Sequence, residues 1–215
     1  MTQPTVDLRF PHAWQAEILG SRPLILPPRR FVYPAQAEEV ERGALEVLVR
    51  PDAPVDPQTD PKCPPSAQEF LATCALGFAD PAVPSGLWSC PNPNQLCAVS
   101  GGYAYLIDTA QPGRFTFLPF RPVLTVRAVP EAGLLLFAGH HALLAWGRAG
   151  LAWQMEKLSD EGLTITSIEG STLRGLGWQM MTDRETEFAL DLTTGHQLSQ
   201  PFGSNTVASK TKEKR

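Results

Sequence analysis

Apolar residues along this chain occur mostly in short runs, many with a period of two, separated by glycine, proline and polar residues. Runs of this length and period are typical of β-strands with one buried face. Residues 31–33 and 44–49 have this character. Residues 35–42, between a proline and Gly43, are predicted to form two turns of helix. The pattern therefore predicts many short strands and little helix.

Residues 66–78 combine two signals. The first four, Ser-Ala-Gln-Glu, have the form of a capping box, which favours a helix. From Phe70 to Phe78, however, every second residue is apolar, which favours a strand. We favour the strand, because it can pair with residues 44–49 across residues 51–65, a stretch with six prolines in fifteen positions. That proline-rich stretch is predicted to be a mobile loop.

An internal repeat begins near residue 86. Residues 124–129 recur 39 positions later as 163–168, and residues 96–108 align with 134–146 at an offset of 38. The second and third strands of the first two copies are predicted to be joined at glycines. A Gly-Gly pair between apolar runs is a strong hairpin signal, because the twist-matched turn needs positive φ at both positions. Each copy is predicted to contain four short strands.

The period of about 38–40 residues and the four strands of each copy resemble the blades of a β-propeller, as does the strand-turn at residues 190–195. The resemblance covers about half of the chain. It implies an all-β fold with three blade-like, four-stranded antiparallel repeats at about 86–119, 122–158 and 162–199. Residues 1–80 either supply a fourth, irregular sheet that helps to close a propeller-like arrangement, or the sheets stay open with their edges covered by this region or a partner.

The same reading divides the chain into four regions. Residues 1–50 form an N-terminal β-containing region, 51–65 the proline-rich loop, 66–203 the β-repeat domain and 204–215 a basic tail. The tail is polar and has nothing to bury, so we expect it to be disordered.

Composition narrows the classes of partner. The chain has 215 residues, 21 prolines and a formal net charge of −4. A mildly acidic balance argues against nucleic acid or an anionic membrane as a partner, because both require a basic face. No apolar run approaches the roughly 20 residues of a membrane span, and the N-terminus lacks the pattern of a secretory signal. We expect a soluble, cytoplasmic protein.

Cysteine and histidine give little sign of chemistry. The four cysteines, at positions 63, 74, 90 and 97, contain no C-x-x-C spacing, so no structural zinc site is predicted. Because the N-terminus lacks a secretory signal, a disulfide framework is not predicted either. Cys74 and Cys97 lie in apolar runs and are predicted to be core residues, whereas Cys63 is predicted to be exposed. His140 and His141 are the only adjacent histidines, and they could face one ion only from a turn.

No catalytic motif is present, so we assign no catalytic residue, no metal ligand and no cofactor. In a blade-like repeat, the turns between second and third strands gather on one face. The third copy departs from the repeat there, with about six extra residues in the loop 178–187, and insertions of this kind often build binding surfaces. The candidate ligand- or partner-binding residues on this face are Tyr103, His140, His141, Trp178, Gln179, Asp183 and Arg184.

Two functions fit these observations. The first is a non-enzymatic protein-binding or scaffold module that uses the loop face or an open sheet edge. The alternative is a protein that binds a small ligand or a metal, or an enzyme, with its site near the His140-His141 turn. Among the other tryptophans, Trp88 is predicted to be core, and Trp146 and Trp153 to pack as a cross-strand pair or between sheets.

Overall fold

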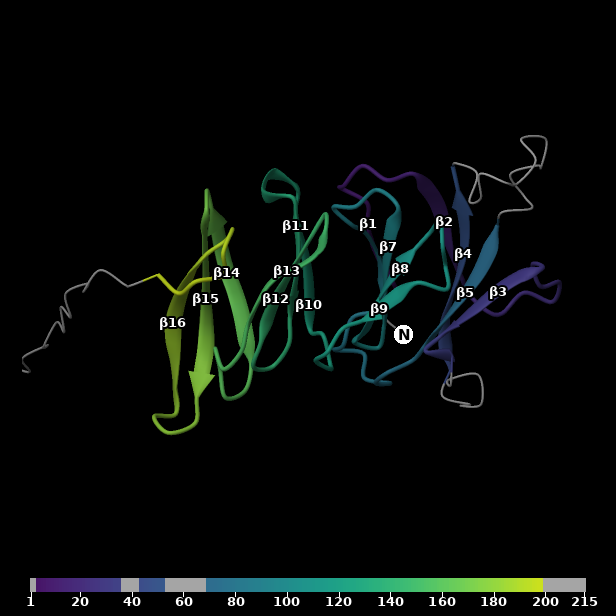
Figure 1. Ribbon diagram of the computed structural model, residues 1–215. Coiled ribbons are helices and arrows are strands. Elements are labelled where there is room, and N and C mark those ends of the chain that lie inside the picture. The colour runs from purple at the N-terminus through teal and green to yellow at the C-terminus, as the bar shows by residue number, and fades with distance from the viewer. Residues whose placement is uncertain (1–2, 36–42, 53–68, 199–215) are drawn as a thin grey trace, which may run out of the picture.

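The computed structural model describes residues 3–35, 43–52 and 69–198, which form an all-β protein with four separate sheets. Figure 1 shows the sheets side by side in an open row, with the N-terminal sheet at one end and the C-terminal sheet at the other. Among the described residues the row does not close into a ring. The expectation of an all-β fold is confirmed.

The first sheet comes from the N-terminal part of the chain and has the order β2-β4-β5-β3. Its strands are β2 (Trp14–Leu19), β4 (Ala44–Pro51), β5 (Phe70–Ala75) and β3 (Arg29–Tyr33). β4 pairs antiparallel with β2 and β5, whereas β3 pairs parallel with β5. The predicted fourth, irregular sheet therefore exists. The pairing of residues 70–75 with 44–49 confirms the strand in the ambiguous segment.

The second sheet has five strands in the order β1-β6-β7-β8-β9. They are β1 (Thr5–Asp7), β6 (Gly86–Ser89), β7 (Gln95–Ser100), β8 (Tyr103–Asp108) and β9 (Phe115–Phe117). The last four form the predicted antiparallel repeat, but β1 adds to β6 in parallel. The first repeat is therefore not a self-contained sheet, because the chain's N-terminal residues complete its edge.

The third sheet is a four-stranded antiparallel meander and the fourth has three strands. The third contains β10 (Thr125–Val129), the short 3-10 turn η3 (Pro130–Ala132), β11 (Leu134–Ala138), β12 (Leu143–Gly147) and β13 (Gly150–Met155). The fourth contains β14 (Leu163–Glu169), β15 (Thr172–Gln179) and β16 (Arg184–Asp191). Where the third repeat was expected to have a fourth strand, the described residues make only an isolated bridge between Leu190 and Gln197.

Three apolar layers hold the row together, one between each pair of neighbouring sheets. The layer between the first and second sheets includes Val47, Phe70 and Tyr105. The second and third sheets share a layer that contains Phe137, and the third and fourth share one that contains Phe188. The inner sheets are thus covered on both faces, which explains why β11 is continuously apolar instead of alternating.

Indole groups join neighbouring sheets at three places. Trp14 in the first sheet donates its Nε1–H to the backbone oxygen of Gln95 in the second, over 3.2 Å. Trp146 in the third sheet donates to the side-chain Oε1 of the same Gln95, over 3.0 Å. Trp153 donates to the carbonyl of Leu192, over 2.8 Å, and so joins the third sheet to the fourth. Each buried indole thereby satisfies its N–H while its ring fills a layer.

This arrangement settles the two alternatives for the pair of tryptophans in the third sheet. A register shift between Ala145 and Trp146 interrupts the pairing of β12 with β13. Trp146 packs toward the second sheet, and Trp153 packs toward the fourth. The cross-strand pair is therefore wrong and packing between sheets is confirmed. The prediction that Trp88 is core is also confirmed, since it is 3% exposed.

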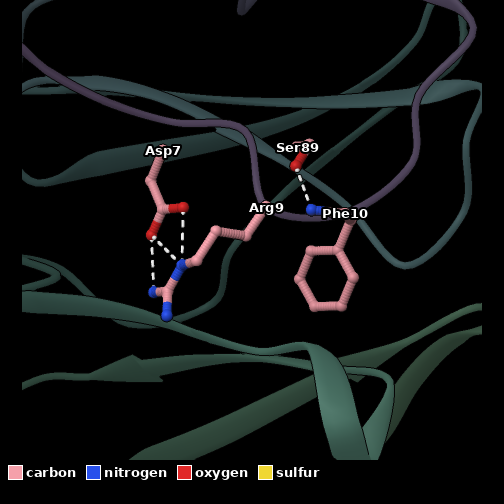
Figure 2. Close-up of polar contacts among 4 residues, drawn as sticks. All are labelled: Asp7, Arg9, Phe10 and Ser89. Carbon is pink, nitrogen blue, oxygen red and sulfur yellow. Dashed lines mark hydrogen bonds and ion pairs between the residues drawn. The ribbon is translucent and has the colours of Figure 1, made fainter.

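The N-terminal segment is bound to the second sheet beyond β1. Figure 2 shows the Arg9 guanidinium against the Asp7 carboxylate, with Nη2 and Oδ2 2.7 Å apart. The backbone N–H of Phe10 donates to the Oγ of the buried Ser89 over 2.9 Å, and the Phe10 ring joins the layer between the second and third sheets. The hydrogen bond from Arg9 lowers the pKa of Asp7.

Several predictions concern residues outside those described. They are the helix over 35–42 beyond Ala35, the loop after Asp52, the exposure of Cys63 and the C-terminal tail. The division of the chain into four regions stays a prediction.

Candidate functional site

The turns between second and third strands belong to three neighbouring sheets and lie along one long side of the sheet row, at the bottom of Figure 1. We call this surface the loop face and define it by Phe78, Gly101–Tyr103, Arg121, His140–His141 and residues 158–160 and 178–184. Backbone hydrogen bonds connect its parts. Phe78 N–H donates to Gly101 O over 2.9 Å, and Leu158 N–H donates to His141 O over 3.0 Å.

Tyr103 is positioned by the glycine turn that precedes it. Gly101 and Gly102 have φ of +54° and +73°, as the predicted hairpin turn requires. The backbone also approaches its neighbours closely. A Cβ on Gly102 would lie 2.5 Å from Cγ1 of Val83 and 2.7 Å from Cβ of Pro122. The two glycines therefore serve both the turn and the contact between segments.

A cluster of aromatic rings and one arginine surrounds Tyr103. The ring centroids of Phe78 and Phe117 lie 5.9 Å and 5.4 Å from that of Tyr103. The Arg121 guanidinium carbon lies 5.3 Å from the Tyr103 centroid and 4.6 Å from that of Phe117, within the range of cation–π attraction. The sequence analysis missed Arg121, because a single arginine carries no periodic signal and its Tyr103 partner lies elsewhere in the chain.

The two histidines occupy the turn between β11 and β12, with ring centroids 5.9 Å apart and planes inclined by 42°. His141 Nδ1 lies 3.2 Å from the backbone oxygen of Ser159, within hydrogen-bond distance. His140 Nδ1 is buried and has no hydrogen-bond partner among the residues that the structure describes. The pair thus differs: one ring is held against the segment that leads to β14, while the other has an unused polar atom.

A small cavity of about 90 Å³ separates the histidine turn from Phe120 and Arg121. Sites for small molecules usually have volumes of about 300–1,000 Å³, so this cavity is too small for a substrate of that class. Within residues 3–35, 43–52 and 69–198, no group of three or more His, Cys, Asp or Glu side chains is placed to hold a metal ion. The geometry therefore gives no support to the metal or ligand alternative at His140 and His141.

The segment 178–187 is not a loop over most of its length, and this prediction is wrong. β15 continues to Gln179 and β16 begins at Arg184, which leaves a turn at residues 180–183. Asp183 adopts the left-handed conformation, with φ of +48°. The extra residues therefore lengthen a hairpin by continued strand pairing, which makes its tip stiffer than a loop of the same length.

The tip of this hairpin is anchored and apolar. Asp160 Oδ2 accepts a hydrogen bond from the backbone N–H of Met180 over 2.7 Å, and Asp160 N–H donates to Trp178 O over 2.8 Å. Ser159 Oγ donates to the same Trp178 oxygen, 3.1 Å away. Yet the side chains of Met180 and Met181 are 65% and 94% exposed. The fold thus holds two methionines in water on a fixed support.

The predicted site residues form a line along the loop face and not a single cluster. Arg121 contacts the Tyr103 ring and lines the cavity beside the histidines, and residues 158–160 connect the histidine turn to Trp178. The remaining predicted residues lie at the far end of the hairpin: Gln179, Asp183 and Arg184. The structure therefore places the seven residues on one face, although it does not bring them to one point.

An apolar groove adjoins the loop face next to Phe78. It has a volume of about 470 Å³, and its walls include Leu76, Val83, Pro81 and Pro4. Phe78 itself is 43% exposed. The sequence analysis did not single out this groove, because its walls come from residues that are separated by up to 81 positions in the chain.

The buried cysteines and tyrosines outside the loop face show no sign of chemical activation. Cys74, Cys90 and Cys97 are fully buried free thiols, and burial raises the pKa of each. The core prediction for Cys74 and Cys97 is confirmed. Burial likewise raises the pKa of Tyr33 and Tyr105. None of these groups has the lowered pKa of an activated nucleophile.

Comparison with known proteins yields no family. No family model matches the chain, and no curated protein does. No helix among the described residues is long and apolar enough to cross a membrane.

Some solved structures have a low structural similarity to this chain. The N-terminal domain of Nup159 is 12% identical, with 93% of this chain and 54% of that chain covered, at a TM-score of 0.35. A chain in a structure of Saccharomyces cerevisiae Dbp5 bound to Nup159, Gle1, IP6 and ADP is 14% identical, with 91% and 53% covered, also at 0.35. The chain spans about half the length of these chains. Because a TM-score of 0.35 is too low to support an argument about the fold, we judge the resemblance to propeller blades from the sheets of this chain alone.

Proposed function

We propose that this chain is a non-enzymatic protein-binding or scaffold module and that a protein partner docks on the loop face. The observation that carries the proposal is the anchored hairpin tip, which presents Met180 and Met181 to solvent. Large apolar side chains held in water cost free energy that binding recovers, at roughly 25 cal/mol per Å² of apolar surface buried.

The chemistry around the tip suits a protein partner. Methionine is unbranched and polarizable, so it adapts to differently shaped apolar surfaces. Trp178 lies one strand position before Gln179 on the same hairpin, and Asp183 and Arg184 add both signs of charge at its rim. Interfaces commonly combine an apolar, aromatic centre with a polar rim. Tyr103, Arg121 and the two histidines would extend the contact along the same face.

The rigidity of the scaffold supports the same function. Three apolar layers and three indole hydrogen bonds fix the sheets against one another, so the turns they carry are held in register. A surface that is ordered before binding loses less conformational entropy when a partner docks. The proposed binding function therefore depends on the packed sheets that hold the turns in place as well as on the exposed side chains.

The test compares two single substitutions of the same kind. Met181→Asp places a charge at the hairpin tip, and Leu151→Asp places one at another exposed apolar position, 56% exposed on the edge strand β13. Proteins that co-purify with the full chain from its native cells are quantified for each variant. We expect a partner whose recovery falls at least about 10-fold with Met181→Asp and is unchanged with Leu151→Asp. Equal losses with both variants, or with neither, would contradict docking on the loop face.

A further inference from the structure

A second surface with binding chemistry lies at the N-terminal end of the row, beside the edge strand β3. A cavity of about 320 Å³ opens there between β3 of the first sheet and the turn before β9 of the second sheet. Its walls include Arg22, Arg30, Phe31, Tyr33 and Phe115. This volume falls in the range of sites that hold a small ligand or a few side chains of a peptide.

The cavity runs along the open edge of β3. Successive side chains of a strand point to opposite faces, so Arg30 and Val32 lie on one face of the sheet and Phe31 and Tyr33 on the other. All four line the cavity, which therefore follows the strand edge instead of covering one face. Within the residues that the structure describes, β3 is the last strand in its sheet, and its one strand partner is β5. Among the described residues, no strand pairs with the other edge of β3.

Tyr33 lies at the base of the cavity and contacts its opposite wall, which the second sheet supplies. Its side chain is 1% exposed, and its hydroxyl donates to the carbonyl of Pro112 over 2.7 Å. The Phe115 ring meets the Tyr33 ring edge-on, with centroids 5.0 Å apart. The edge of β3 and the turn of the second sheet are thus joined at the base of the cavity, and the cavity is a fixed feature of the packing.

The charge of this cavity is opposite to that of the chain. Although the formal net charge is −4, the described residues that form the walls include two arginines and no Asp or Glu. Both arginines are exposed, and neither forms an ion pair or hydrogen bond within the part of the chain that the structure describes. Close to Arg22 in the chain, Leu24 and Ile25 are 104% and 91% exposed. Within the described residues, the unpaired Arg22 thus precedes two exposed apolar side chains closely in the chain.

We propose that this edge binds an extended acidic peptide segment of another protein, which adds as a strand beside β3. Main-chain hydrogen bonds to the open edge of β3 would supply affinity, as in other cases of strand addition. Because side chains of the added strand alternate, one set would reach Arg22 and Arg30 through carboxylates. The other set would lie against the apolar rings of Phe31 and Phe115.

This site is independent of the proposed docking on the loop face. The hairpin tip belongs to the fourth sheet, whereas β3 belongs to the first sheet, at opposite ends of the row (Figure 1). Loss of a partner through Met181→Asp would leave peptide binding at β3 unchanged, so failure of one proposal is distinguishable from failure of the other.

The test uses a fluorescein-labelled octapeptide of alternating Glu and Val, with a Gln-Val peptide of the same length as the uncharged reference. Fluorescence polarisation with the full chain measures both affinities. We expect the Glu-Val peptide to bind more tightly, and the double variant R22Q/R30Q to weaken it about 10-fold, as two partly exposed ion pairs would. Arg148→Gln, an exposed arginine in the turn before β13, is the matched control and should leave the affinity unchanged.

Amide hydrogen exchange locates the bound peptide. We expect slower exchange over Arg29–Tyr33 when the Glu-Val peptide is present, and unchanged exchange in the hairpin of β15 and β16. Three results would overturn the proposal: no binding at a peptide concentration of about 1 mM, equal binding of the Gln-Val peptide, or protection confined to other strands. Tighter binding of a single-stranded oligonucleotide of equal charge would also overturn it, in favour of a nucleic-acid site.

Discussion

Replacement of Trp146 by alanine tests the packing between the second and third sheets. The Trp146 side chain is 6% exposed, lies in the layer between these sheets and donates its Nε1–H to Gln95 Oε1 over 3.0 Å. Gln95 also accepts a hydrogen bond from Trp14 of the first sheet through its backbone oxygen. The substitution therefore empties part of a core layer and removes one of the contacts that meet at Gln95.

The expected loss of stability follows from these two contributions. Truncation of a buried tryptophan to alanine costs about 3–5 kcal/mol, mostly through the cavity left behind. The hydrogen bond contributes about 1 kcal/mol of this, and its acceptor is left without that partner. With a urea dependence of about 2 kcal/mol/M, the midpoint of unfolding should fall by about 1.5–2.5 M.

Equilibrium unfolding in urea, followed by far-UV circular dichroism, measures this shift. Trp178→Ala is the matched control, since Trp178 is half-buried on β15 of the end sheet and should cost about 1 kcal/mol or less. A double-mutant cycle with Trp146→Phe and Gln95→Leu isolates the hydrogen bond, for which we expect a coupling of about 1 kcal/mol. A cost below about 1 kcal/mol for Trp146→Ala would refute the packing of these sheets as described.

Three further predictions follow from the close approaches, thiols and ion pairs. Gly77→Ala should lower the free energy of unfolding by about 1–3 kcal/mol in the same urea assay, because the added Cβ would overlap the Tyr103 ring; a neutral result would contradict this contact. With Cys63→Ser, a disulfide reagent should detect no thiol in the folded protein and three in denaturant, since the other cysteines are buried. Asp7→Asn should lower stability by at most about 1 kcal/mol at neutral pH. The hydrogen bond from Arg9 lowers the pKa of Asp7 below 3.8, so its contribution is full above that pH and is lost as pH falls through the lowered pKa; a difference that persists in strong acid would contradict this origin.

Local patterns were enough to predict most of the repeated part. The Gly101-Gly102 turn and the apolar runs around it correspond to β7 and β8, and the two copies 124–129 and 163–168 both form first strands of their sheets. These elements depend on neighbouring residues, whose alternation and turn chemistry are visible in one stretch of sequence.

The parts that sequence analysis missed depend on distant residues. β1 pairs with β6, about 80 positions away, and β2 was not recognised although its Trp14 is 1% exposed. Both segments are short and mix apolar with polar residues, so their sequences alone do not indicate strands. They form strands because they pair with β6 and β4. The same holds for the site, since Arg121 joins it through the ring of Tyr103, which belongs to another part of the chain.

The hairpin of the fourth sheet shows a different kind of error. The departure of residues 178–187 from the internal repeat favoured a loop, yet cross-strand pairing extends through Trp178 and Glu185. Strand propensity depends on what lies opposite and on the surroundings of each face, so an exposed polar hairpin carries little signal in its composition.

Site-specific photo-cross-linking tests the central claim, that a protein partner docks on the loop face, most directly. A photoreactive phenylalanine analogue replaces Met181 at the hairpin tip in one version of the full chain and Leu151 on β13 in another, and both are irradiated in native cells. The account predicts one dominant covalent adduct to a protein from position 181 and none from position 151. Adducts of equal yield from both positions, or from position 151 alone, would contradict it.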